Sequence, residues 1–85
     1  MTISASLLSF SRASVQVPAN TVVTIVLQNN DASVAHDFQV SELGQTDSCL
    51  GPCSRSVSFN SGPASTYAFR CSIHPDLMSG SFVVR

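Results

Sequence analysis

The chain of 85 residues contains no lysine, and only 11% of its residues are charged, which leaves a formal net charge of −1. Without a basic patch nothing can hold the phosphates of a nucleic acid, and without an acidic run nothing attracts a strongly basic protein. We therefore expect no nucleic-acid partner and no partner that binds through a strongly basic surface.

Long hydrophobic runs are also missing. No run approaches the roughly 20 apolar residues that cross a bilayer, and the N-terminus lacks the charged start and apolar centre of a signal peptide. We expect no membrane span within these residues. Neither absence predicts a cytoplasmic protein, because Met1 stands directly before a strand-like segment, which is typical of a trimmed chain. A signal peptide or membrane anchor in the natural chain stays open.

A helical period of apolar residues is missing as well, whereas alternating apolar residues and short turn segments recur along the chain. Period-two alternation predicts strands. In residues 3–7 it places Ile3, Ala5 and Leu7 on one inward face. No period survives from residue 41 to 56, which predicts an irregular excursion there. Further strands are expected at residues 15–17, 21–27, 36–40, 57–59, 67–71 and 82–84.

About seven short strands with turns at this spacing predict an all-β fold, a Greek-key β-sandwich. A chain of 85 residues is long enough for one domain with a modest core. We therefore expect a single domain over residues 1–85, for which a metal site or a disulfide would be a useful cross-link.

Residues of metal-binding types gather in one segment near the C-terminus. Cys71, His74 and Met78 bring a thiolate, an imidazole and a thioether into one short loop. The only other histidine, His36, alternates with apolar residues and so points toward the core. Two histidines, one cysteine and a weak axial methionine make a blue-copper electron-transfer site.

Two other interpretations of these residues compete with copper. The first is coincidence: a buried cysteine, a surface histidine and a core methionine that happen to lie close in the sequence. The second is a structural zinc site, but zinc prefers more thiolates, carboxylates or imidazoles and has little use for a thioether. The combination of donors favours copper.

On these motifs the chain resembles the cupredoxins, and most of all the small plastocyanin and amicyanin branch. The resemblance spans nearly the whole chain and rests on a histidine before Asp-Phe, on Tyr-x-Phe-x-Cys-Ser-x-His and on a closing Met-x-Gly. It implies one copper ion, alternating between Cu(I) and Cu(II), with His36, Cys71, His74 and Met78 as ligands. Two features depart from the family pattern. Asp37 stands where relatives have Asn, and the gap between His74 and Met78 lies between those usual in amicyanins and in plastocyanins.

The predicted function is that of a one-electron carrier and not of an enzyme, because protein donors fill the metal site and leave little room for a substrate. The resemblance implies that redox partner proteins dock transiently at the ring edge of His74, bordered by Pro75, Leu77, Val34 and Ala35. We expect a monomer. The alternatives are a copper carrier or chaperone, a copper-binding domain of a larger redox protein, and a metal-free interaction module.

Two further features leave alternatives open. With Cys71 assigned to the metal, Cys49 and Cys53 remain as a pair. They could form a structural disulfide, a second metal site or a redox switch; the disulfide is favoured and indicates an oxidising compartment, periplasmic or otherwise extracytoplasmic. Asp37 is either simply solvated or accepts hydrogen bonds from Ser72, which would tie the His36 strand to the metal loop.

Overall fold

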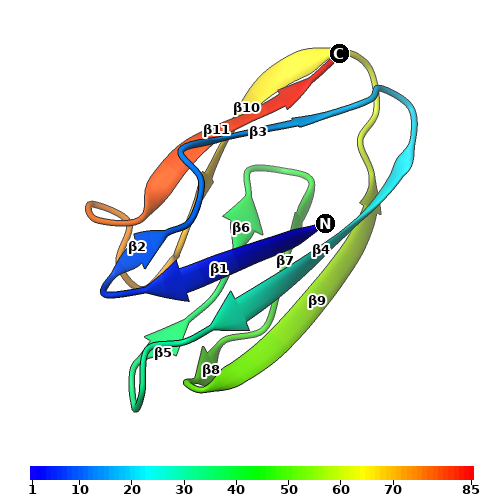
Figure 1. Cartoon of the computed structure of the whole chain (residues 1–85). Coiled ribbons are helices and arrows are strands. Elements are labelled where there is room, and N and C mark those ends of the chain that lie inside the picture. Colours follow the sequence, from blue (N-terminus) through cyan, green and yellow to red (C-terminus); the bar gives the residue numbers. More distant parts are fainter.

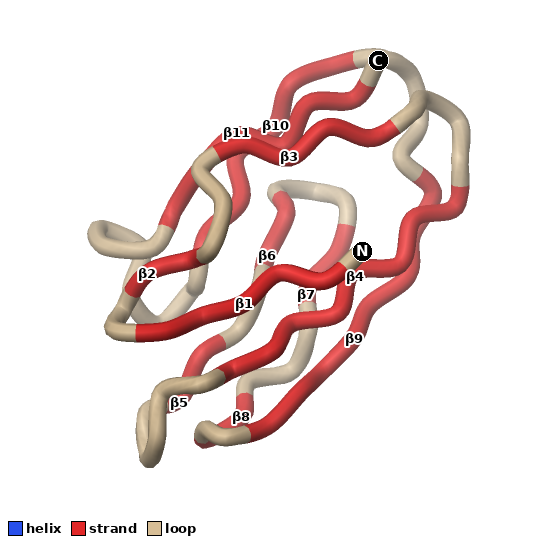
Figure 2. Tube along the Cα trace, in the orientation of Figure 1, coloured by secondary structure: helices blue, strands red, loops and turns tan.

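The computed structural model describes residues 1–85 and consists of β-strands and connections (Figures 1 and 2). It contains no helix with the length and apolar character that crossing a membrane requires. The all-β class expected from the sequence is confirmed, with more strands than anticipated. The strands are β1 (Thr2–Ser6), β2 (Ser9–Phe10), β3 (Ser14–Val17), β4 (Val22–Asn29), β5 (Ala35–His36), β6 (Gln39–Val40), β7 (Gly44–Gln45), β8 (Cys49–Leu50), β9 (Cys53–Asn60), β10 (Ser65–Arg70) and β11 (Ser79–Val84).

Two sheets form the sandwich. One has the strand order β2-β1-β4-β9, the other β3-β11-β10-β6-β7, and β5 pairs separately with β8. Two neighbouring pairs, β1 with β4 and β3 with β11, are parallel. Parallel neighbours cannot be joined by a hairpin, so the chain crosses to the opposite sheet between them, as a Greek-key arrangement requires.

The core lies between the sheets and continues to the end that carries the candidate ligands. Phe38 and Phe69 stack with ring centroids 5.0 Å apart, and Phe10 meets them edge-on at 5.4 and 5.6 Å. Residues two apart on a strand share a face. Phe38 follows His36 by two residues and Phe69 precedes Cys71 by two, and all four side chains are fully buried. Phe38, Phe69 and Cys71 belong to the same core cluster, so the core continues from the aromatic rings to the candidate ligands.

Two expectations about strands are wrong. Leu7 does not face inward but is 89% exposed, because β1 ends at Ser6 and the chain turns through Leu7 and Leu8, both with positive φ. The segment expected to be irregular up to residue 56 contains the start of β9, which pairs with β4 from Asn29↔Cys53 to Val22↔Asn60. As an edge strand with exposed serines, β9 is defined by its backbone pairing and not by an apolar pattern.

Candidate metal centre

Three of the four expected ligands converge in space. The donor atoms of His36, Cys71 and His74 all lie within 4.8 Å of one another. The sulfur Sγ of Cys71 is 3.8 Å from Nδ1 of His36 and 3.7 Å from Nδ1 of His74. Both imidazoles therefore turn the same nitrogen toward the thiol, although they come from distant parts of the chain.

The loop that carries the other ligands is closed by its own backbone. The N–H of Cys71 donates to the carbonyl of Met78 at 2.9 Å, and the N–H groups of His74 and Met78 donate to Cys71 and His74 at 3.1 and 3.0 Å. These bonds bring both ends of the loop together where β10 passes into β11. The Met78 side chain is buried in the same apolar cluster as Cys71, and its role as axial ligand stays a prediction.

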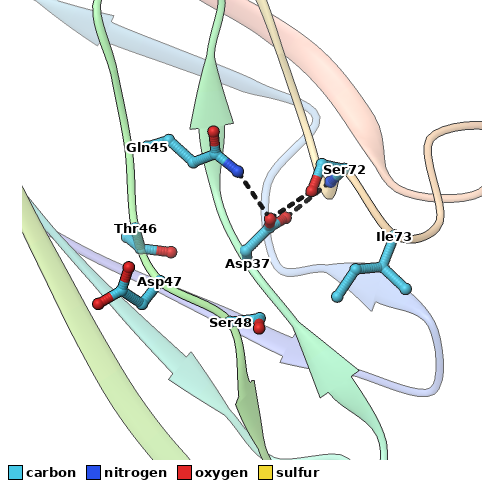
Figure 3. A pocket seen from close by; sticks show the side chains of 7 residues that line it. All are labelled: Asp37, Gln45, Thr46, Asp47, Ser48, Ser72 and Ile73. Carbon is cyan, nitrogen blue, oxygen red and sulfur yellow. Dashed lines mark hydrogen bonds between the residues drawn. The ribbon is translucent and has the colours of Figure 1, made fainter.

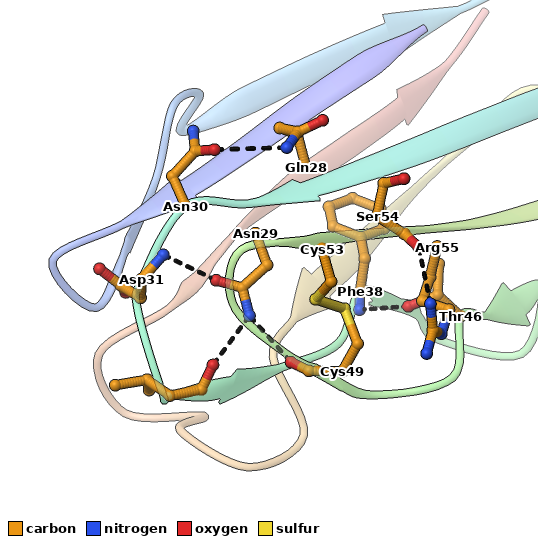
Figure 4. Close-up of a disulfide and its surroundings, with 11 residues drawn as sticks. Gln28, Asn29, Asn30, Asp31, Phe38, Thr46, Cys49, Cys53, Ser54 and Arg55 are labelled. Carbon is orange, nitrogen blue, oxygen red and sulfur yellow. Dashed lines mark hydrogen bonds between the residues drawn. A yellow bond between two sulfur atoms is a disulfide. The ribbon is translucent and has the colours of Figure 1, made fainter.

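A disulfide loop holds the segment around His36. β5 pairs with β8 so that His36 lies opposite Cys49. Cys49 is bonded to Cys53 (Figure 4). The expected disulfide is confirmed, and Cys71 is the free cysteine. Gly51, between the two cysteines, packs so closely that a Cβ atom there would lie 2.1 Å from the carbonyl oxygen of Asp31. Only glycine permits this approach of the disulfide loop to the turn before β5.

Asp31 contacts the far side of the His36 ring, a contact that the sequence reasoning missed. Its Oδ2 lies 2.6 Å from Nε2 of His36. The N–H of Leu8 and the contact with His36 lower the pKa of Asp31 to about 2, although burial acts in the opposite direction. Asp31 is therefore an anion at neutral pH. The only signal in the sequence was a carboxylate five residues before a histidine, which is uninformative until the turn between them is known.

Asp37 links the His36 segment to the metal loop (Figure 3). Its carboxylate accepts hydrogen bonds from the N–H of Ser72 at 2.7 Å, from the Ser72 hydroxyl and from Nε2 of Gln45 at 3.0 Å. It is 3% exposed, so the interpretation as a simply solvated residue is wrong. Asp37 therefore holds Ser72, the residue after Cys71, beside the segment that carries His36.

The site is buried except at one histidine. His36, Cys71 and Met78 are at most 1% exposed, whereas His74 is half-buried. His74 also borders an open hollow lined by Leu7, Leu8, Val34 and Asp31. One ligand therefore reaches the surface, where three of the residues that line the hollow beside it are apolar.

The donor set fits copper. Two imidazole nitrogens and one cysteine sulfur converge, and a thioether lies in the same cluster, which is the combination found at blue-copper sites. No carboxylate oxygen belongs to the convergent set, which argues against a hard cation. Zinc would have little use for the thioether of Met78. The residues present therefore match a copper ion better than the alternatives.

No curated protein sequence matches the chain, but solved structures do. Auracyanin A, described as a "blue" copper protein from the thermophilic bacterium Chloroflexus aurantiacus, is 22% identical over 100% of this chain and 97% of its own, with a TM-score of 0.90. The auracyanin of Roseiflexus castenholzii is 16% identical over 99% and 94%, with a TM-score of 0.91. Amicyanin from Paracoccus versutus is 18% identical over 99% and 79%, with a TM-score of 0.71. These matches establish a shared fold.

Family membership rests on the sequence itself. The family described as the cupredoxin-like domain matches residues 1–84, which is all of the chain except its last residue. The match includes both segments that carry the convergent donors. This protein belongs to the cupredoxin-like domain family.

Proposed function

We propose that the protein is a one-electron carrier with a type 1 copper site formed by His36, Cys71, His74 and Met78. The observation that carries the proposal is the convergence of the Cys71 thiol and the Nδ1 atoms of both histidines within 4.8 Å. A copper ion held there would take up and release one electron at a time, alternating between Cu(II) and Cu(I). No other group of His, Cys, Asp or Glu in the structure offers such a cluster.

The protein's own contribution is a site that is rigid before the metal arrives. Asp37 ties the two ligand segments together, the loop is closed by backbone hydrogen bonds, and the aromatic cluster of Phe10, Phe38 and Phe69 packs beneath. Donors held by such contacts keep nearly the same geometry in both oxidation states. Little reorganisation is then needed when an electron enters or leaves, which favours fast transfer over bond chemistry.

Redox partners are proposed to dock where His74 reaches the surface. The expected border is Val34, Ala35, Pro75 and Leu77. Of these, Val34 lines the hollow beside His74 together with two exposed leucines of the β1–β2 turn, Leu7 and Leu8, which supports adding both leucines to the proposed border. A small apolar patch of this kind gives weak and short-lived contact, which suits a carrier that must leave after each transfer. The carrier is proposed to act as a monomer and to catalyse no reaction of its own.

An extracytoplasmic location, periplasmic in a bacterium, is proposed on the disulfide. Cys49 and Cys53 are bonded to each other, and structural disulfides persist mainly in oxidising compartments. Cell fractionation with reporter fusions to the natural chain tests this location, and a cytoplasmic signal would contradict it.

The function is tested by adding Cu(II) to the purified protein and recording its visible and electron-spin spectra. One copper per chain and an intense blue band are expected, because a Cu(II)–thiolate bond in a constrained site absorbs strongly. A mild reductant should bleach the band and an oxidant should restore it. A colourless complex would contradict the proposal, and rapid loss of copper to a competing Cu(I) chelator would instead indicate a copper carrier.

A further inference from the structure

The His36 ring is contacted at both of its nitrogens. Nδ1 faces Sγ of Cys71 at 3.8 Å, and Nε2 lies 2.6 Å from Oδ2 of Asp31. The His36 side chain is 0% exposed and that of Asp31 is 10% exposed, so water competes little for this contact. When Nδ1 serves as a metal donor, Nε2 must carry the ring proton and donate it to the carboxylate.

Asp31 is itself held in place from two sides. The N–H groups of Leu7 and Leu8 donate to its two carboxylate oxygens, Leu8 at 3.0 Å. On the other side its own N–H donates to Oδ1 of the fully buried Asn29 at 2.9 Å. Leu7 and Leu8 have φ values of 52° and 57°, a conformation that persists in non-glycine residues only where the surroundings hold it. The carboxylate therefore has a defined position as well as a charge.

His74 has no comparable support. Its Nδ1 faces Cys71, and no protein group forms a hydrogen bond with its Nε2. Of the two histidines that turn Nδ1 toward the thiol, only the buried one has an anion behind it. A neutral backbone carbonyl would be enough to orient the ring, so the charge of Asp31 adds an electrostatic effect on His36 to the positioning.

We propose that Asp31 is a positioning residue that makes His36 a stronger donor and thereby favours Cu(II) over Cu(I) at the site. The inference rests on the proposed copper-binding function, which makes His36 a ligand. Hydrogen-bonded partners of metal-bound histidines fix the ring and raise its basicity. A more basic imidazole with a negative charge behind it stabilises the more highly charged ion. The reduction potential of the site is lower than His36 alone would set it.

The first test compares Asp31→Asn with Asp76→Asn. Asparagine at position 31 keeps the shape but removes the charge, whereas Asp76 is an exposed carboxylate on the loop between His74 and Met78. Both variants should bind one copper and stay blue. For Asp31→Asn the equilibrium should shift about tenfold toward Cu(I), a rise of about 59 mV in midpoint potential for a one-electron couple. Asp76→Asn should change it much less, because exposed charges are screened. Equal shifts in the two variants, or none, would overturn the inference.

A second test needs no metal. In nitrogen-15 labelled, metal-free protein, NMR should find the His36 ring proton on Nε2 and exchanging slowly with water, because it is buried and bonded to Asp31. Exchange should become faster in Asp31→Asn and stay unchanged in Asp76→Asn. A ring proton confined to Nδ1, or fast exchange in the unsubstituted protein, would overturn the inference even if Asp31→Asn does not fold. Failure of the unsubstituted protein to turn blue would contradict the proposed function instead, and the NMR result would still decide whether Asp31 holds His36.

Discussion

The two segments that form the metal centre are held together in different ways. The loop from Cys71 to Met78 is closed by hydrogen bonds among its own backbone groups. His36 instead lies on a strand of two residues and is held by groups from elsewhere: the carboxylate of Asp31 and the disulfide-bonded segment that pairs with β5. One half of the site is thus organised locally, and the other depends on contacts across the fold.

This difference matches the exposure of the two histidines. His74, on the locally closed loop, is half-buried and borders apolar surface, whereas His36 is completely buried. The loop from Cys71 to Met78 can face a partner protein because its own backbone hydrogen bonds close it, without contacts on its surface side. The other half keeps water away from the metal. The following predictions test this division, beginning with the largest expected effect.

The largest effect is expected from Cys71→Ser, which removes the sulfur atom that faces both histidines. The blue band should vanish completely, because the thiolate supplies the charge transfer to Cu(II). The fold should remain, because the other core residues are unchanged, and far-ultraviolet circular dichroism checks this. Persistence of the band in a folded variant would mean that the centre is assigned to the wrong cysteine.

The two histidines should respond differently to removal. In His74→Gly the vacated position opens to the surface, so that added imidazole should restore the blue spectrum. In His36→Gly the vacated position lies behind Asp31 within the fold, and imidazole should restore the spectrum poorly or not at all. Titrating both variants with imidazole compares them directly. Equal restoration would show that burial of His36 does not limit access.

The contacts that hold the buried segment around His36 can be weakened without substituting a proposed ligand. Asn29→Ala removes the acceptor of the Asp31 N–H and the donor to the carbonyls of Val34 and Cys49. Buried backbone groups without partners are costly, so the free energy of unfolding should fall by about 3 kcal/mol. Asn30, the exposed neighbour of Asn29, provides a matched control. Asn30→Ala should change the free energy of unfolding by less than about 0.5 kcal/mol. Urea denaturation measures both, and similar losses would contradict the assigned role of Asn29.

The disulfide should contribute less than Asn29 to the free energy of unfolding. The double variant Cys49→Ser with Cys53→Ser opens a loop with a sequence separation of only 4. The chain-entropy model assigns about 2 kcal/mol to so short a loop. Denaturation without reductant should show this loss, and the blue band should survive because neither residue is a proposed ligand. Loss of the band would mean that the disulfide is needed to keep His36 in place.

The smallest effect is expected at Met78, since a thioether binds copper weakly and tunes the potential more than it holds the metal. Met78→Gln should retain one copper and lower the midpoint potential, because an amide oxygen favours Cu(II). Met78→Leu should raise it by removing a donor and drying the site. Protein-film voltammetry measures both. If neither substitution moves the potential, Met78 is a core residue and the axial position is empty or filled by the carbonyl of Ala35.

Much of the fold was predictable because alternation decides which side chains face the core. It correctly placed Phe38 and Val40 inward together with His36. It failed at Leu7, where the chain leaves the sheet one residue earlier than the pattern suggests. It also failed at the start of β9, whose exposed serines and arginine carry no apolar signal and pair with β4 through their backbone.

The sequence by itself determined the locally closed half of the site. Cys71, His74 and Met78 lie so close along the chain that a single short loop brings them together, and its backbone can satisfy most of its own hydrogen bonds. Tertiary structure decided the other half. Asp31 meets His36, and Asp37 meets Ser72, only because a turn and two sheets bring separate segments within hydrogen-bonding distance. A carboxylate's partner depends on distances of a few ångströms, and the packing of the whole fold sets those distances.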